Sequence, residues 1–171
     1  MNAQSKIAIA DLMNQITVED VTSIEKIAEE CLKRLCMFKL NQRTHFSFPK
    51  RHRIDAGHPG IYIVWKGNTP IYVGESRCIQ DRYGDLHRTV NHTLRRQIGK
   101  TIYGETASSK RKFPDTIERK LDNYFSKHLS MSFVPVYFGR IEIQDEIIKI
   151  LQLNHSLYND RISRGTKIKG A

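Results

Sequence analysis

Two tyrosines in short glycine-containing strings are the residues of this chain whose types and spacing point most directly to chemistry. The strings are Gly60-Ile61-Tyr62 and Tyr72-Val73-Gly74, and the turn-prone run 66–70 separates them. A β-hairpin would therefore carry the two phenols on paired strands. In a strongly basic protein such a pair suggests chemistry on a nucleic acid. The simpler alternative is an aromatic pair that only stabilises the hairpin.

Two charged residues border the apolar stripes of predicted helices. Glu146 lies beside the stripe of the last predicted helix, and Arg82 lies beside that of the helix after the hairpin. A charge at the edge of a core is costly unless it is paired or functional. Arg82 and Glu146 are therefore candidates for a site. The alternatives are an ion pair between them, or two rim residues whose stems cover apolar surface while their charges reach water.

Composition indicates the class of protein in which these residues act. The chain has 171 residues, 39% of them hydrophobic, which suffices for one main domain. Its net charge of +10 favours a polyanionic partner, although charge by itself does not separate DNA from RNA or an anionic membrane surface. No apolar run approaches the roughly 20 residues of a membrane helix, and the N-terminus lacks the order of a signal peptide. We therefore expect a soluble, cytoplasmic protein without a membrane partner.

The three cysteines form no CxxC pair, and their odd number favours reduced thiols over a disulfide or zinc framework. A bound metal would then need oxygen ligands.

The hydrophobic pattern predicts the elements that hold these residues. An amphipathic helix of about four turns begins at a capping box formed by Thr22 and Glu25. Pro135 would place the third predicted strand at a sheet edge or a bulge. The other predicted elements are a short helix over 7–13, a polar connector over 41–60, the hairpin from residue 60, a helix capped by Ser76 and reaching Val90, a helix opened by Asn91 or Thr93, a basic loop over 104–112, a helix from Pro114, the third strand over 133–138 and a last helix over 141–153.

Taken together, these features resemble the signature of the GIY-YIG nuclease family. Besides the two strings, the chain has Arg82 ten positions after Tyr72, the late carboxylate Glu146, and Asn159 beyond it. The resemblance covers about residues 58–160. It implies an α+β fold, with a small three-stranded antiparallel sheet flanked by helices. The implied activity is that of a divalent-metal phosphodiesterase that leaves 5′-phosphate and 3′-hydroxyl ends.

The resemblance also implies roles for single residues. Tyr62 would activate the attacking water, which requires nearby cations because a phenol with a pKa of about 10 is a poor base at neutral pH. Tyr72 would position the nucleophile or the phosphate. Arg82 would hold the scissile phosphate, since its planar fork matches two oxygens. Glu146 would bind one Mg²⁺ or Mn²⁺, with water and phosphate oxygens completing the shell.

The chain departs from the family pattern at two places. Many relatives have His or Tyr four residues after the arginine, where this chain has Leu86. His87 is the candidate replacement, because Gly84 could distort the helix between them. A proline commonly precedes the terminal asparagine, but this chain has one extra residue there. Asn159 is therefore the candidate, with Asn154 as the alternative.

Basic and polar residues after the hairpin are the predicted DNA contacts. Most would hold phosphates rather than read bases. The segment 91–96 mixes polar side chains with two arginines and is the candidate for reading sequence, its alternative being a capped, solvated helix. The predicted contacts are Arg88, Asn91, His92, Arg95, Arg96, Lys100, Lys110, Arg111 and Lys112.

The predicted organisation is an N-terminal helical extension with a basic connector over 1–54, packed on a GIY-YIG-like domain over 55–160, and a basic tail over 161–171. Three functions stay open. The first is a small restriction-like DNA endonuclease, for which cutting both strands would favour a homodimer. The second is a repair, phage or mobile-element nuclease that reads DNA structure. The third is a nucleic-acid-binding module without catalysis.

Overall fold

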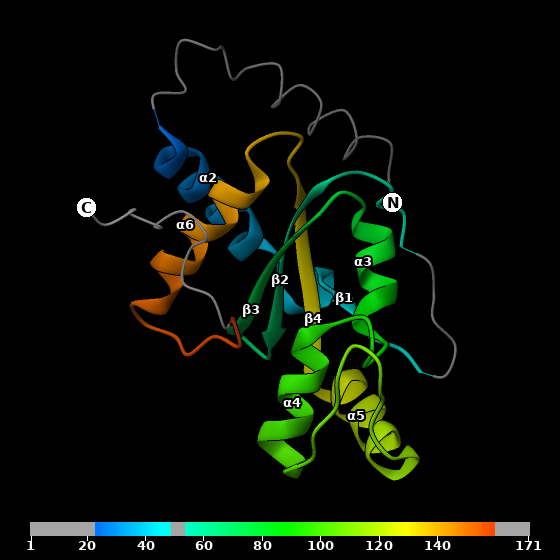
Figure 1. Ribbon diagram of the computed structural model, residues 1–171. Coiled ribbons are helices and arrows are strands. Elements are labelled where there is room, and N and C mark those ends of the chain that lie inside the picture. The colour runs from blue at the N-terminus through cyan, green and yellow to red at the C-terminus, as the bar shows by residue number, and fades with distance from the viewer. Residues whose placement is uncertain (1–22, 49–53, 160–171) are drawn as a thin grey trace, which may run out of the picture.

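The protein is an α+β domain built on a four-stranded antiparallel sheet, as a computed structural model shows (Figure 1). The structure describes residues 23–48 and 54–159. The sheet has the order β1-β4-β2-β3. Its strands are β1 (Thr44–His45), β2 (Gly60–Lys66), β3 (Thr69–Ser76) and β4 (Leu129–Pro135). The helices are α2 (Ile24–Met37), a 3-10 turn (Leu40–Gln42), α3 (Ile79–Leu86), α4 (Thr93–Tyr103), α5 (Asp115–His128) and α6 (Arg140–Gln152).

The hairpin that carries the tyrosines is confirmed. Strands β2 and β3 pair, and Gly67 in the connecting turn has φ +57°, which glycine adopts readily. Tyr62 lies opposite Gly74, and Tyr72 lies opposite Val64. The two tyrosines are therefore diagonal neighbours on one face of the sheet, not direct cross-strand partners.

Two predictions about the sheet are wrong. The sheet has a fourth strand, β1, which is only two residues long and so carries no alternating pattern that a sequence could display. β1 pairs with β4, which places β4 in the interior of the sheet despite Pro135. The proline is tolerated because it is the last residue of β4, whereas β1 reaches only Ser130 and Met131.

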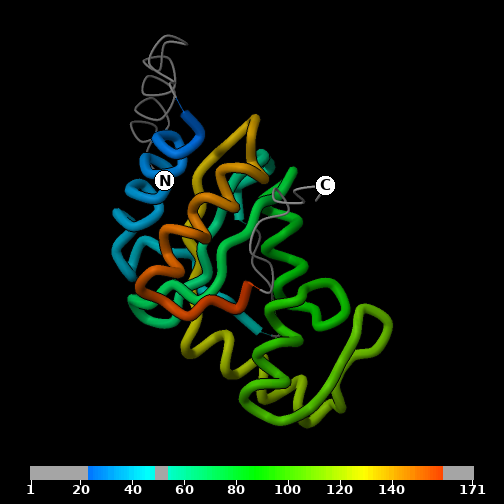
Figure 2. Tube along the Cα trace, turned by 60° about the vertical axis from the view of Figure 1, so that its left-hand side comes forward, coloured from blue at the N-terminus to red at the C-terminus, as the bar shows by residue number. Residues whose placement is uncertain are grey.

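Helices cover both faces of the sheet. α2 and α6 lie side by side on one face, where they pack over Ile61, Ile63 and Trp65 (Figures 1 and 2). The face with Tyr62 and Val64 packs against α3, α4 and α5. Successive residues of β2 point to opposite faces, and both sets are buried. The Tyr62 side chain therefore lies on one face of the sheet, and the buried side chains of α6 lie on the other face.

The starts of two helices differ from prediction by one or two residues, whereas α4 begins at Thr93, one of the two predicted starts. α2 is capped by Ser23, whose hydroxyl accepts a hydrogen bond from Lys26 N at 3.3 Å. The predicted cap, Thr22, lies outside the described residues. Ser76 ends β3, and its hydroxyl accepts a hydrogen bond from the amide of Cys78, the residue before α3. His92 precedes α4 and accepts the amide hydrogen bond of Leu94.

The predicted N-terminal extension is continuous with the core where the structure describes it. Ala28 and Leu35 of α2 are buried against Ile143 and Ile147 of α6, and β1 joins the sheet. The predicted short helix over 7–13, the basic residues 50–53 and the tail over 161–171 lie outside the described residues. Within residues 23–48 and 54–159, no helix has the length and apolar character needed to cross a membrane.

Candidate active site

The structure gathers Tyr62, Tyr72 and His92 into one aromatic cluster. The Tyr62 hydroxyl lies 3.0 Å from His92 Nε2. The ring centroids of the two tyrosines are 6.2 Å apart, and the rings of Tyr72 and His92 meet edge to face at 5.3 Å. Gly74 makes room for this arrangement, because a Cβ at that position would overlap the Tyr62 phenol. Close packing against Tyr62 therefore explains why residue 74, the last of the second string, is a glycine.

Burial controls the protonation of the cluster. Tyr62 is 1% exposed, and this burial raises the pKa of its phenol well above 10, with Tyr72 adding to the rise and the Arg82 charge opposing it. His92 is also buried. Desolvation lowers the pKa of its imidazole to about 3, helped by the positive charges of Arg82 and Arg96. At neutral pH the site therefore holds a neutral phenol and a neutral imidazole.

The hydrogen bonds fix which way the protons point. The Leu94 amide can only donate, so His92 Nδ1 accepts its hydrogen bond at 3.1 Å and the ring proton lies on Nε2. His92 Nε2 then donates to the Tyr62 oxygen. The Tyr62 hydroxyl is hydrogen-bonded in turn to Tyr72, which contributes to its raised pKa. The chain of donors runs from the start of α4 through two buried rings to Tyr72, which is half-buried on the edge strand β3.

Arg82 of α3 adds a positive charge beside these rings. Its charge acts on the pKa values of both Tyr62 and His92, which places it close to the pair. Its Nε is buried and has no hydrogen-bond partner among the described residues. A buried donor left without an acceptor costs about 1–3 kcal/mol. Arg82 therefore offers an unused N–H group that an anionic ligand could satisfy.

The structure does not bring Glu146 to this cluster. Glu146 lies on α6, whose layer covers the opposite face of the sheet, and its carboxylate forms an ion pair with Lys149. Lys149 in turn interacts electrostatically with Glu25 at the start of α2. Glu146 thus belongs to a charged rim of the α2–α6 layer. No ion pair joins it to Arg82 in the described chain, so that alternative is wrong.

His87 also lies apart from the tyrosine pair. Its ring packs among Phe46, Phe48 and Tyr83, and its Nδ1 hydrogen-bonds the Tyr83 carbonyl at 2.7 Å. The histidine that reaches the tyrosines is His92, one of the predicted DNA contacts. Its position directly before a predicted helix was the available signal, since a side chain there can cap the helix and be fixed by it.

Asn159 holds the edge strand on which Tyr72 lies. Its side-chain oxygen accepts from Val73 N at 3.0 Å, and its side-chain nitrogen donates to Val73 O at 2.7 Å. The neighbouring Tyr158 amide donates to Ile71 O at 2.8 Å. The Asn159 side chain therefore bonds to the free edge of β3 as a neighbouring strand would. These bonds hold the backbone of Val73, the residue after Tyr72. Asn154, the alternative, is exposed in the turn after α6.

The predicted DNA contacts fall into three groups, which are buried, half-buried and exposed. Arg95 is 1% exposed and forms ion pairs with Glu118 at 2.9 Å and Asp122 at 2.6 Å, so it is a core residue and its assignment to the surface is wrong. His92 is buried, as described above. Arg96 is half-buried and donates to the carbonyls of residues 89 and 90. The exposed members are Arg88, Asn91, Lys100, Lys110, Arg111 and Lys112.

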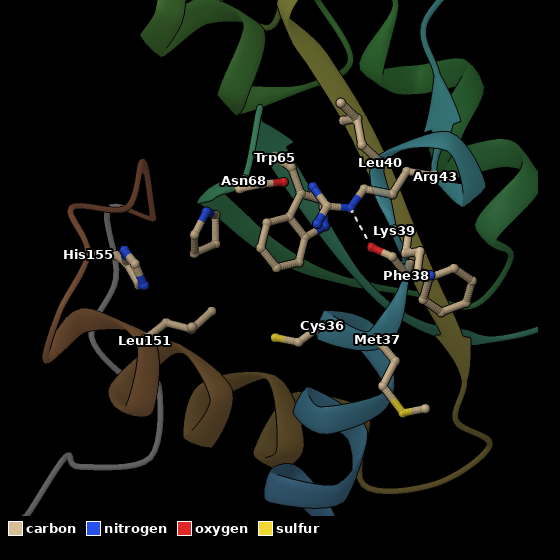
Figure 3. Close-up of a pocket in the computed structure, with 11 residues that line it drawn as sticks. Cys36, Met37, Phe38, Lys39, Leu40, Arg43, Trp65, Asn68, Leu151 and His155 are labelled. Carbon is tan, nitrogen blue, oxygen red and sulfur yellow. Dashed lines mark hydrogen bonds between the residues drawn. The ribbon is translucent and has the colours of Figure 1, made fainter.

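A separate cavity of about 560 Å³ lies at the hairpin end of the α2–α6 layer (Figure 3). It lies between the end of α2, Trp65, Leu151 and His155. Arg43 forms one wall, with its guanidinium 4.1 Å from the Trp65 ring centroid and hydrogen bonds to the carbonyls of Phe38 and Gly67. Because Trp65 faces the layer opposite to Tyr62, this cavity is distinct from the tyrosine cluster.

Comparison with protein-family models, with curated proteins and with solved structures finds no match to this chain. The described residues contain no group of three or more histidine, cysteine, aspartate and glutamate side chains that could hold a metal ion. The class of the protein is therefore defined by its geometry. It is an α+β domain with an aromatic hydrogen-bonded chain beside the edge strand of its sheet, and with an arginine donor there that has no partner among residues 23–48 and 54–159.

Proposed function

We propose that the protein is a phosphodiester-cleaving endonuclease that acts on DNA, as the resemblance to GIY-YIG nucleases suggests. One observation carries the proposal. Tyr62, Tyr72 and His92 are joined by hydrogen bonds, and the buried Nε of Arg82 beside them has no acceptor in the part of the chain that the structure describes. A phosphate oxygen is the acceptor that such donors fit, and the net charge of +10 favours a polyanionic substrate.

The expected chemistry follows from the direction of the donors. Hydrolysis of a phosphodiester adds negative charge around phosphorus, which fixed donors stabilise. Arg82 would bind one phosphate oxygen. Tyr72 would donate to another oxygen, because His92 and Tyr62 behind it orient the chain outward. Tyr62 is too buried to touch water directly, so any part it takes in activating the nucleophile would pass through Tyr72.

The magnesium predicted at Glu146 does not fit this geometry. A Mg²⁺ ion that acts on the scissile phosphate needs a carboxylate facing that phosphate. Glu146 is paired with Lys149 in the layer opposite to Tyr62. A metal ion at Glu146 would therefore not face a phosphate held by Arg82 and Tyr72. Whether cleavage depends on Mg²⁺ or Mn²⁺ is tested directly by comparing each ion with EDTA.

Incubation with supercoiled plasmid tests the proposal. The parent protein should cut the plasmid, and the ends should carry 5′-phosphates. Discrete bands would favour a restriction-like enzyme, for which we expect a homodimer, whereas nicks or smears would favour a nuclease that reads DNA structure. Arg82→Ala should lose at least about a hundred-fold in rate, because a donor to the developing charge is worth that much. Failure of the folded parent protein to cut under every ion condition would refute the proposal.

A matched arginine controls for lost charge. Arg34 lies on α2 in the opposite layer, and its side chain pairs with Glu30 four residues earlier. Arg34→Ala should cut at the parental rate. If Arg82→Ala and Arg34→Ala are equally active, Arg82 is a structural residue and the assigned site is wrong.

The position of Glu146 favours one second candidate, a DNA-binding module without catalysis. Such a module would use the same basic surface but would not need a carboxylate beside the tyrosines. It would retard the plasmid in a gel without cutting it. The plasmid experiment therefore separates the two functions.

A further inference from the structure

A second recess adjoins the tyrosine cluster and has no role in the chemistry described above. This α4 groove has a volume of about 620 Å³ and lies between Thr93, Arg96, Gln97 and Lys100 on one side and Tyr158 on the other. The volume is within the range of small-ligand sites. Thr93 directly follows His92 in the chain, and the Tyr158 amide is bonded to Ile71 beside Tyr72. The groove therefore lies next to the candidate active site.

The groove carries the groups that recognise a nucleotide. Its cations are Arg96 and the exposed Lys100, and no acidic residue lies among the residues that line it. Tyr158 is half-buried and packs against the core below, so its ring is held in place at low entropic cost. Aromatic rings stack on bases of any sequence, and lysines bind phosphates. Together these groups fit a strand of nucleic acid better than a small anion.

One residue that lines the groove, Gln97, carries a polar atom without a partner among residues 23–48 and 54–159. The side-chain oxygen of Gln97 is buried and has no hydrogen-bond partner in the described part of the chain. An amide oxygen in this state lacks a donor. Among nucleobase groups, the exocyclic amines of adenine, cytosine and guanine supply such a donor, and glutamine pairs with adenine in this way. Thymine has no exocyclic amine, and its one donor is the ring N3–H, which lies between two carbonyl groups.

We propose that the α4 groove binds an unpaired nucleotide of the substrate strand next to the scissile phosphate. Lys100 contacts its phosphate, Tyr158 stacks on its base, and the Gln97 oxygen accepts a hydrogen bond from the exocyclic amine of adenine, cytosine or guanine. This site rests on the proposed function for its substrate, and it adds a preference for amine-bearing bases that the tyrosine cluster cannot supply.

Binding of short single strands of dA, dC or dT, measured by fluorescence anisotropy in EDTA, tests the role of Gln97. The parent should bind dA and dC more tightly than dT by about five-fold or more, the factor that one base-edge contact supplies. Gln97→Leu should lose this preference, and Gln97→Met serves as a second variant of similar length. Because homopolymers differ in their own stacking, the decisive quantity is the change in the ratio between parent and variants. An unchanged ratio in both folded variants would overturn the proposal.

The phosphate contact has a matched control. Lys100→Ala should lower the slope of log affinity against log salt by about 0.7, as expected for one lost contact to a single strand. Lys33 is an exposed lysine on α2, in the opposite layer, and Lys33→Ala should leave the slope unchanged. Equal slopes for the two variants would show that Lys100 does not contact a phosphate in the groove.

Stacking is tested with two substitutions of Tyr158. Tyr158→Phe keeps the ring and should bind like the parent. Tyr158→Leu keeps an apolar side chain against the core but should weaken binding of all three strands by about five-fold or more. Thermal unfolding confirms that each variant is folded. Equal binding by the two variants would contradict the stacking.

The outcomes separate this site from the proposed hydrolysis. If the parent protein shows the base preference but never cuts plasmid, nucleotide binding in the α4 groove is supported and the proposed nuclease activity is refuted. If the parent protein cuts plasmid but shows none of these preferences, the nuclease activity is supported and nucleotide binding in the α4 groove is refuted. A parent that binds no single strand in EDTA would also overturn the groove.

Discussion

Replacement of His92 by asparagine tests the hydrogen-bonded chain through the pH dependence of stability. Asparagine can still accept the Leu94 amide hydrogen bond at the start of α4, but it does not titrate. The buried imidazole has its pKa lowered to about 3, whereas a histidine in the unfolded chain has a pKa near 6.5. Between these two pKa values, His92 is therefore protonated in the unfolded state and neutral in the folded state. His92 should make the parent lose stability as the pH falls from about 6.5 toward 3.

The size of the effect follows from these two pKa values. Protonation of the unfolded chain alone costs the parent about 2 kcal/mol of unfolding free energy between pH 7 and pH 5. Below pH 5 the loss should continue at about 1.4 kcal/mol per pH unit until the folded-state pKa is reached. Urea unfolding at several pH values measures this quantity for the parent and for His92→Asn.

The difference between the two proteins is the readout, because other groups titrate equally in both. The stability of His92→Asn relative to the parent should rise by about 2 kcal/mol between pH 7 and pH 5. His128→Asn removes an exposed histidine at the end of α5 and should follow the parent. If parent and His92→Asn keep a constant difference over this range, His92 is not held neutral and the proton arrangement at Tyr62 is wrong.

Two further predictions concern packing and ion pairs. Gly74→Ala should lower the free energy of unfolding by about 1–3 kcal/mol, because its Cβ would overlap the Tyr62 ring. Gly84 of α3 has open space around it, so Gly84→Ala should raise the free energy of unfolding by up to about 1 kcal/mol. Equal effects of the two substitutions in urea unfolding would contradict the close approach of Gly74 to Tyr62. Arg95→Met should cost about 3 kcal/mol because it leaves two carboxylates without their buried partner, while Arg34→Met on the exposed side of α2 should cost less than about 0.5 kcal/mol. Similar losses for both arginine variants would show that Arg95 is not a core ion pair.

Local patterns sufficed for the elements that depend on near neighbours in the chain. The hairpin follows from two apolar runs joined at Gly67, and most helices follow from apolar stripes at helical spacing. The short strand β1 was missed because two residues form a strand only when a partner strand is already in place. Pro135 misled for a related reason, since its tolerance depends on where the neighbouring strand stops.

The candidate site was predictable in part. Tyr62, Tyr72 and Arg82 were found from their spacing, and the structure places them near one another. His92 was predicted to lie on the DNA-binding surface, but its side chain is buried against Tyr62, a partner thirty positions away and beyond any local pattern. Arg95 was taken for a surface cation because its two acidic partners lie on another helix. Long-range pairing of this kind is invisible to helical periodicity.

The sequence by itself determined the hairpin with a tyrosine on each strand, most of the helices and the basic charge, because each depends on residue types at short spacing. The diagonal placement of the two tyrosines follows from the register of the strands, which only the structure shows. Only the tertiary structure decided which face of the sheet each helix covers. A helical stripe shows that Glu146 borders a core, but it does not show which of two cores. Packing placed Glu146 with α2 and brought His92 to Tyr62, because burial of both sheet faces requires two separate layers of helices.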